Sequence, residues 1–483
     1  MESVKINDSC TTILVGKKAS YDGSTIIVRS CDDPAGKFTP KRFEVVKPAN
    51  QPTKYKAVYS KCEVDLPNDP LQYTSLPCST RENGIWGSAG FNSKNVGMSS
   101  TETITSNALV QGADPLVETG LGEEDFFTIT IPYIHCAKDG PKKLGEYLEK
   151  YGTYEMNGIA FNDENDIWYI ETIGGHHWIA KRVPEDCYAV IPNQQGIDVF
   201  DFVDAFGEQK DHMCSKDMID FIVNNHLSDK TKEELAKCTN FRMRNAVGSH
   251  TDFDISYNTC RAWFTLRYFN PSEKEKFQID DFNLPWCKVP DNKITIQDIK
   301  YVMSSYFNNT KYNPYLKYGD GSEKGKYRYI GINRTAETGM LQIRGYMPDK
   351  LKCVKWVSLG SNAFNAFVPQ YAQVDTTPEY LFNSTHDCNT NNFYWTNRLI
   401  ACITDSHYTT CNVPVEQYQL RVLGKSFELL NKFDAKFKEK EFDLKEANQE
   451  ISDYFQKETQ GLLNKVLFIA SCEMKNAFSR SDA

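Results

Sequence analysis

A cysteine and an arginine near the start of the chain have a spacing that could activate a thiol. Cys10 and Arg29 are joined by CTTILVGKKASYDGSTIIVR, in which two short apolar runs flank the step Asp22-Gly23. An Asp-Gly step supplies the positive φ of a tight hairpin, so the two ends of this segment should lie close together. A guanidinium beside a thiol favours the thiolate, which is the nucleophilic form of cysteine. The residues alone also allow Cys10 to be a small buried apolar side chain.

Two neighbouring residues add to this candidate site. Asp32 follows Arg29 in the pattern R-x-x-D, so its carboxylate could orient a nearby amine or the guanidinium itself. The same spacing is compatible with a purely structural ion pair between Arg29 and Asp32. Cys31 could be a buried side chain, or it could form a disulfide with Cys10 under oxidation and inactivate the protein.

The eight histidines do not suggest a metal site. His176 and His177 are adjacent in a predicted strand, so we expect their side chains to point to opposite faces. The chain has no His-Glu-x-x-His motif, no Cys/His set with the spacing of zinc ligands and no glycine-rich phosphate-binding motif. We therefore expect neither a metal nor an organic cofactor.

Short strands should position these residues. Residues 10–16 and 24–30 are predicted to form the first hairpin, residues 166–173 and 176–183 a second one across Gly174-Gly175, and residues 187–193 a further strand. A helix is predicted to begin at Asp139, because Pro141 follows early and residues 144–152 read LGEYLEKYG.

The last part of the chain has a different pattern. From about Pro414 onward, the apolar residues Phe427, Leu430, Phe433 and Phe437 recur on one helical face, and charged residues fill the opposite face. Strands early in the chain and helices at its end predict an α+β fold. Trp168, Trp178 and Trp263 are expected to be core residues.

The composition excludes several classes of protein. The 483 residues carry a net charge of −9, so a basic nucleic-acid-binding surface is not expected. No apolar run approaches the ~20 residues of a membrane span, and the first residues, MESVKINDSC, lack the apolar core of a signal peptide. Without secretion, the 15 cysteines are expected to be reduced thiols in a cytoplasmic protein.

Several motifs together resemble a known family. The opening run CTTILVGKKASYDGSTIIVRSCDD looks very like the start of the dipeptidase A family. These are cysteine dipeptidases of the N-terminal nucleophile (Ntn) hydrolase superfamily, to which secernins are related. The resemblance extends to NVGMSSTET (95–103), DPLVETGLGEED (114–125), residues 157–194, YNTCRAWF (257–264) and RTAETGMLQIRG (334–345).

The resemblance implies a fold and a mechanism. The fold would be the four-layer αββα Ntn sandwich, in which two antiparallel sheets stack between helices. Residues 1–9 would be a propeptide removed on maturation, with self-cleavage as one route, and residues 10–483 the dipeptidase domain, with a helical part from about 414 to 483. The free α-amine of Cys10 would then act as the base for its own thiol, since an amine of pKa about 7.7–8.0 and a thiol of pKa about 8.5 are matched. The thiolate would form an acyl-enzyme that water hydrolyses.

The resemblance also implies roles for individual residues. Distant relatives such as choloylglycine hydrolases keep an R-x-x-D pattern, which Arg29 and Asp32 match. Their oxyanion asparagine is similar in position to Asn193, and a later arginine to Arg261, although the nearby Arg267 could be a structural partner instead. A second oxyanion asparagine of the relatives falls near Glu102. An ionised carboxylate cannot donate to an oxyanion, so Glu102 is expected instead to bind the ammonium of a dipeptide substrate.

Two alternatives share much of this pattern. An Ntn amidase acting on another amide, such as an N-acyl amino acid, would have the same nucleophile and a different pocket. A secernin-like protein that works by interaction would keep residues 1–9, and the nitrogen of Cys10 would then be an amide without basicity. The expected partners are dipeptides, with neither nucleic acid nor membrane, and a homo-oligomer is possible.

Overall fold

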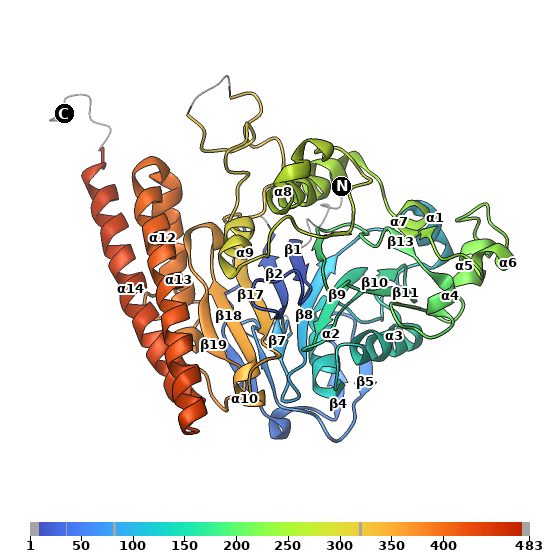
Figure 1. Ribbon diagram of the computed structural model, residues 1–483, viewed down its shortest axis with the longest axis horizontal. Helices are drawn as coiled ribbons and strands as arrows, with labels where there is room; N and C mark the ends of the chain where they lie inside the picture. Colours follow the sequence, from blue (N-terminus) through green and yellow to red (C-terminus); the bar gives the residue numbers. More distant parts are fainter. Residues whose placement is uncertain (1–8, 35, 81–83, 318–320, 476–483) are drawn as a thin grey trace.

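The computed structural model describes residues 9–34, 36–80, 84–317 and 321–475, and for residues 100–102 it describes the backbone only. Two antiparallel sheets and the helices that cover them form the centre of the fold (Figure 1). None of the described helices combines the length and the apolar composition that crossing a bilayer requires.

The larger sheet contains seven strands. In spatial order these are β16 (Cys287–Lys288), β12 (Tyr188–Ile191), β1 (Ser9–Val15), β2 (Thr25–Asp32), β17 (Thr335–Ile343), β18 (Cys353–Leu359) and β19 (Val368–Tyr371). The predicted hairpin is confirmed: β1 and β2 pair antiparallel, Gly23 in the turn has φ +82°, and Cys10 lies opposite Cys31. The ends of β1 and β2 that carry the candidate site residues are therefore adjacent.

The second sheet contains six strands. In spatial order these are β14 (His212–Cys214), β11 (His177–Arg182), β10 (Ile167–Ile173), β9 (Asn157–Asn162), β8 (Gly97–Thr103) and β7 (Gly90–Phe91). The predicted second hairpin is confirmed as β10 and β11, joined by a turn in which Gly174 has φ +87°. Three further pairs of short strands lie outside the two sheets: β3 (Glu44–Val46) with β6 (Tyr73–Ser75), β4 (Lys54–Lys56) with β5 (Glu63–Asp65), and β13 (Val199–Phe200) with β15 (Phe241–Arg242).

The two sheets bury an apolar cluster between them. Leu14, Ile27 and Leu341 from the large sheet share this cluster with Ala160 and Tyr169 from the small one, and β1 and β2 contact β8. Side chains alternate between the faces of a strand, so Cys10 lies on the same face of β1 as Leu14. The space between the sheets is thus apolar along most of its length and holds Cys10 at one end.

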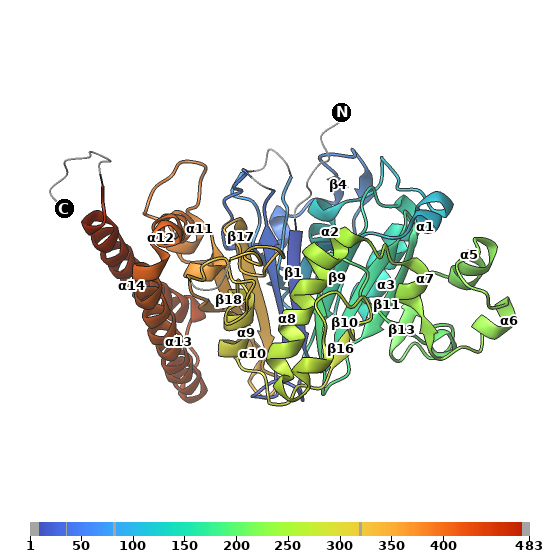
Figure 2. The ribbon, with the colours of Figure 1, turned by 90° about the horizontal axis from the view of Figure 1, so that it is seen from above.

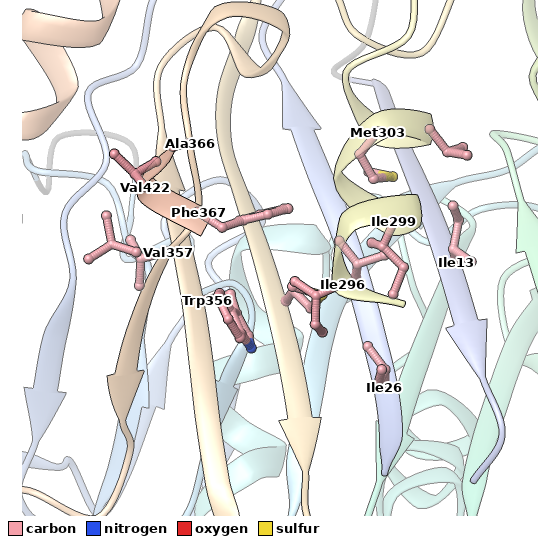
Figure 3. Packing of buried hydrophobic residues seen from close by; sticks show 14 of the residues in the cluster. Ile13, Ile26, Ile296, Ile299, Met303, Trp356, Val357, Ala366, Phe367 and Val422 are labelled. Atoms are coloured by element: carbon pink, nitrogen blue, oxygen red, sulfur yellow. The ribbon is translucent and has the colours of Figure 1, made fainter. Parts of the chain in front are cut away.

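Helices cover the outer face of each sheet (Figures 1 and 2). On the large sheet these are α8 (Cys260–Phe269), α9 (Ile296–Met303), α12 (Phe393–Ser406), α13 (Tyr408–Glu439) and α14 (Leu444–Cys472). Figure 3 shows Ile296, Ile299 and Met303 of α9 packed near Ile13 and Ile26 of the sheet. On the small sheet, α2 (Glu123–Thr130) and α3 (Asp139–Tyr151) pack over a third cluster. Helix α3 begins at the predicted residue.

The remaining helices are short. They are α1 (Ala108–Ala113), α4 (Phe202–Ala205), α5 (Met218–Asn224), α6 (Lys232–Leu235), α7 (Met243–Val247), α10 (Asp349–Lys352) and α11 (Glu379–Phe382), with 3-10 turns at Pro48–Asn50, Ile131–Tyr133, Pro271–Lys276 and Asn362–Phe364. A π-helical turn, Asp254–Thr259, leads directly into α8.

The helical C-terminal part begins earlier than the sequence predicted. It starts at α12 with Phe393 rather than near Pro414, and Pro414 lies inside α13. Proline usually ends a helix because it lacks the N–H of the helical hydrogen bond. Here Pro414 lies in the second turn of α13, where the burial of Cys411 and Val415 holds the helix against its neighbours.

Candidate active site

Cys10 and Arg29 are in direct contact at the end of the first hairpin. Both side chains are buried, and Nη2 of Arg29 donates a hydrogen bond to Sγ of Cys10. The antiparallel register explains the contact: Arg29 lies opposite Thr12, two residues from Cys10 and on the same face of the sheet. The guanidinium of Arg29 therefore lies beside the thiol of Cys10, as the hairpin predicted.

Two carboxylates hold this guanidinium from other elements. The same Nη2 atom of Arg29 donates to Oε1 of Glu123 at 2.8 Å, and Nη1 lies 3.6 Å from Oε1 of Glu337. Burial by itself would lower the pKa of Arg29, but the negative charges around it, that of Cys10 first, raise the pKa well above its ordinary value. The arginine therefore stays charged in an environment that excludes water.

The backbone explains why these carboxylates meet there. Glu337 of β17 lies opposite Cys31 in register, and Glu123 is the first residue of α2. Gly339 lies opposite Arg29, and a Cβ at this position would come within 2.6 Å of the Cβ of Ala89. The absence of a side chain at residue 339 lets Ala89 pack closely against this part of β17.

Asn193 and Arg261 lie on the other side of Cys10. Oδ1 of Asn193 accepts hydrogen bonds from the backbone N–H of Cys10 at 3.1 Å and from Nη2 of Arg261 at 2.8 Å. This leaves Nδ2 of Asn193 as a buried donor without a hydrogen-bond partner among the described residues. Arg261 also donates to the carbonyl oxygen of Cys10 and to Oγ1 of Thr11.

The π-helical turn before α8 fixes the position of Arg261. Nη2 of Arg261 donates to Oδ1 of Asn258 at 2.7 Å, and Nδ2 of Asn258 donates to Oδ1 of Asp254 at 2.7 Å. Oδ2 of Asp254 in turn accepts hydrogen bonds from the backbone and the hydroxyl of Thr251. Single π-helical turns are frequent at functional sites. By contrast, Arg267 lies over the ring of Trp263 and pairs with Glu275, away from Cys10.

The R-x-x-D pattern allowed Asp32 to orient the guanidinium of Arg29. In the structure, Asp32 has other neighbours. It lies three residues from Arg29 and thus on the opposite face of β2. There it pairs with Nη2 of Arg328, and its Oδ1 accepts from Oγ1 of Thr335 at 2.7 Å. Asp32 also lies opposite Ser9 in register, and Arg328 donates to Oγ of Ser9 at 2.9 Å. The carboxylate is therefore beside the bond that precedes Cys10.

Two predictions lie outside the described residues. The backbone of Glu102 lies in β8 opposite Gly158, but its side chain is not among those described. Residues 1–8 of the predicted propeptide are likewise outside the description.

The prediction for the two histidines was wrong. His176 precedes β11, so strand alternation does not apply to it, and both rings turn toward one carboxylate. Nδ1 of His176 lies 2.9 Å from Oδ1 of Asp114, and Nδ1 of His177 lies 2.7 Å from Oδ2. Among the residues that the structure describes, no group of three or more His, Cys, Asp or Glu side chains could hold a metal ion. The three tryptophans are buried, as predicted.

Sequence reasoning missed three charged residues around Cys10: Glu123, Glu337 and Arg328. Glu123 and Glu337 lie inside two of the motifs that carried the resemblance, DPLVETGLGEED and RTAETGMLQIRG. Charged residues within such motifs were a signal that could have identified both. Arg328 follows a polar glycine-containing stretch and had no comparable signal.

The resemblance seen in the sequence is confirmed by comparison with known proteins. The family model of peptidase family C69 matches residues 9–421. A protein named probable dipeptidase A, from Streptococcus pyogenes serotype M18 (strain MGAS8232), is 49% identical over 475 residues, covering 98% of this chain and 98% of the relative. A dipeptidase of Bifidobacterium longum (strain NCC 2705) is 44% identical over 537 residues, covering 98% and 100%. Dipeptidase A of Lactobacillus helveticus is 42% identical over 469 residues, covering 95% and 96%.

Proposed function

The chain belongs to peptidase family C69, and we propose that it is a dipeptidase in which the thiol of Cys10 is the nucleophile. The observation that carries this proposal is the buried contact between Nη2 of Arg29 and Sγ of Cys10. A fixed positive charge in a buried site favours the thiolate. The thiolate attacks the peptide carbonyl to give a thioester, the C-terminal amino acid leaves with the proton that was taken from the thiol, and water then hydrolyses the thioester.

Asn193 is suited to stabilise the oxyanion that forms on the carbonyl oxygen. Arg261 occupies Oδ1 of its amide, so Nδ2 remains available as a buried donor beside Cys10. One donor of this kind typically contributes about 3 kcal/mol to the transition state. Arg261 acts on the reaction by orienting this amide and the backbone of Cys10.

The base is the α-amine of Cys10, which requires the loss of residues 1–9. In the intact chain this nitrogen is an amide that donates to Oδ1 of Asn193. After cleavage it becomes an amine with a pKa of about 7.7–8.0, which can accept the thiol proton near neutral pH. Asp32 lies opposite Ser9, next to where this amine forms, and can orient it. Removal of the prefix, in a self-catalysed reaction, is part of the proposal.

The same proposal includes the class of substrate and the assignment of the fold to the Ntn-hydrolase type. The names of the similar proteins support dipeptides as substrates. Two antiparallel sheets that face each other, with helices on both outer faces, support an Ntn αββα sandwich. We place the enzyme in the cytoplasm, and Glu102 remains a candidate for substrate binding. The enzyme needs no metal or organic cofactor and can form a homo-oligomer.

The test combines protein mass with dipeptide hydrolysis. We expect the purified protein to begin at Cys10, to hydrolyse dipeptides, and to lose both maturation and hydrolysis in Cys10→Ala. Cys402→Ala, which removes an exposed cysteine on α12, serves as the matched control and should keep full activity. A protein that begins at Met1 or Glu2 and hydrolyses no dipeptide would instead favour a secernin-like interaction protein. Hydrolysis of N-acyl amino acids in preference to dipeptides would identify an Ntn amidase.

A further inference from the structure

The ammonium of a dipeptide must be bound close to the nucleophile. Its α-nitrogen lies one carbon from the scissile carbonyl, at about 2.5 Å from the carbonyl carbon. The attacking sulfur approaches that carbon to about 3–3.5 Å, and an ammonium–carboxylate hydrogen bond adds about 2.8 Å. A carboxylate oxygen that binds this ammonium therefore lies within about 9 Å of Sγ of Cys10.

Glu123 lies inside this radius. One nitrogen of Arg29, Nη2, donates both to Sγ of Cys10 and to Oε1 of Glu123. Two hydrogen bonds in series span at most about 6 Å, which sets the upper limit for the distance from the thiol to the carboxylate. Glu123 is the first residue of α2, which packs on the small sheet, so it belongs to a different layer from the strand that carries Cys10.

Two other carboxylates nearby have cations beside them other than Arg29. Asp32 lies on the opposite face of β2, where Arg328 and Thr335 occupy its oxygens. Glu337 is buried beneath Arg29, and burial raises the pKa of its carboxyl, while the charges of Arg29, Lys41 and Lys355 oppose that rise. Each of these carboxylates thus has a cation beside it other than Arg29, and Glu123 has none among the described residues.

Glu123, by contrast, depends on a shared charge. Its one cationic partner among the described residues is Arg29, which also serves Glu337 and the thiol. When Cys10 is a thiolate, one guanidinium faces three negative groups, so a cation entering the site is favoured. The side chains are almost fully buried, and charge interactions strengthen where water is excluded. The unpartnered Nδ2 of Asn193, which can bind the substrate oxygen, lies on the other side of the nucleophile.

We propose that Glu123 binds the α-ammonium of the dipeptide and so makes a free amino group the feature that the site selects. This inference rests on the proposed dipeptidase function and names the residue that would give it its specificity. The sequence suggested Glu102 for the same role, so the two glutamates are rivals in the test.

The experiment compares two substrates that differ only in the ammonium. Ala-Ala and N-propionyl-alanine have the same scissile amide and the same C-terminal carboxylate. We expect the mature wild-type enzyme to prefer Ala-Ala in kcat/KM by about 10- to 100-fold, the range expected for one hydrogen bond to a charged group. In Glu123→Gln, which keeps an oxygen for Arg29, the preference should fall to within about threefold, mainly through loss of activity on Ala-Ala.

Glu337→Gln is the matched control, because it also touches Arg29. It should lower kcat/KM for both substrates by the same factor and leave the preference unchanged. Glu102→Gln should likewise keep the preference. If Glu123→Gln does not fold, Glu123→Asp replaces it, and withdrawing the carboxylate by one methylene should reduce the preference measurably.

The outcomes separate this inference from the function on which it rests. Wild-type enzyme that does not hydrolyse Ala-Ala would refute the dipeptidase proposal itself. Wild-type enzyme that hydrolyses both substrates equally, or a folded Glu123 variant that retains the full preference, would refute only the role of Glu123. Loss of the preference in Glu102→Gln alone would move the ammonium site to that residue.

Discussion

Two buried cations on opposite sides of the large sheet differ in what surrounds them. Arg29 lies between the sheets with two carboxylates and the thiol, and these negative groups outweigh burial and raise its pKa. Lys300 lies on α9, on the helix-covered side, where its Nζ donates to neutral oxygens of Ser304 and Asn362. Burial lowers the pKa of Lys300 to about 7. The same loss of water thus has opposite results at these two cations, because several negative groups surround Arg29 and only neutral oxygens accept from Lys300.

Buried charged side chains gather around Cys10, in a space that is otherwise apolar. A buried ion pair seldom stabilises a fold more than apolar residues of the same size would. The space between the sheets is apolar around Leu14, Ile27 and Leu341, yet it holds charged groups around Cys10. We infer that those charges serve the thiol chemistry, whereas the core on the helix-covered side contributes mainly stability.

Removing Arg29 should have the largest effect. Arg29→Gln leaves Glu123 and Glu337 without their shared cation, which should lower the free energy of unfolding by about 3–5 kcal/mol. The thiolate loses the same partner, so kcat/KM for Ala-Ala should fall by two to four orders of magnitude, at about 1.4 kcal/mol for each tenfold change. Urea unfolding and initial rates measure the two effects. Arg267→Gln, a change on the same helix as Arg261 but outside the site, should leave activity within about threefold.

Asn193→Ala should reduce turnover without a comparable effect on binding. Loss of one oxyanion donor lowers kcat by about 10²- to 10³-fold, while KM should change little because the donor acts mainly in the transition state. Asn193→Asp, which keeps the size but lacks the donor, should be similarly slow. An aspartate variant with wild-type kcat would argue against an oxyanion role.

Shortening an apolar side chain on the helix-covered side should lower stability much more than activity. Ile299 of α9 is fully buried near Ile13 and Ile26 (Figure 3). Ile299→Ala should lower the free energy of unfolding by about 3 kcal/mol and change kcat/KM of the folded enzyme by less than about threefold. Unfolding in denaturant measures the change in stability, and initial rates are measured at denaturant concentrations where the variant is still folded. A large loss of activity in the folded variant would contradict the inference that this side of the sheet contributes mainly stability.

The smallest expected effect is a dependence of stability on pH that arises from Lys300. In the unfolded chain its pKa is the ordinary value near 10.5, and in the folded protein it is about 7. Between these values the unfolded state binds more protons, so stability should rise with pH by about 1 kcal/mol per unit. Below pH 7 the contribution becomes constant, because both states are protonated.

Lys300→Met isolates this contribution. The unfolding free energies of wild type and variant are measured at pH 7.5 and 9.5. The wild type should gain stability relative to the variant as the pH rises. An unchanged difference would mean that Lys300 keeps its charge by another route, such as local access of water.

Local patterns in the sequence predicted a good part of this site. The Asp22-Gly23 turn and the two apolar runs correctly predicted the hairpin that brings Arg29 to Cys10, because hairpin pairing is determined by neighbouring residues. The motifs also directed attention to Asn193 and Arg261, which the structure places beside Cys10. The assignment of their catalytic roles remains a prediction.

Other features required the tertiary structure. Glu123 and Glu337 lie 94 and 308 residues from Arg29 along the chain. No local pattern relates positions that only sheet register and helix packing bring together. The pairing of Asp32 with Arg328 and the convergence of His176 and His177 on Asp114 have the same origin.

The sequence by itself determined the strands and helices with strong periodicity, the family resemblance and the identity of the nucleophile candidate, since each depends on residue types at short spacing. Tertiary structure alone decided which charges compensate one another. Coulomb energy depends on distance in space and on the exclusion of water, and neither can be read from spacing along the chain. For that reason the arginine beside Cys10 was predictable, whereas the glutamate that shares its charge was not.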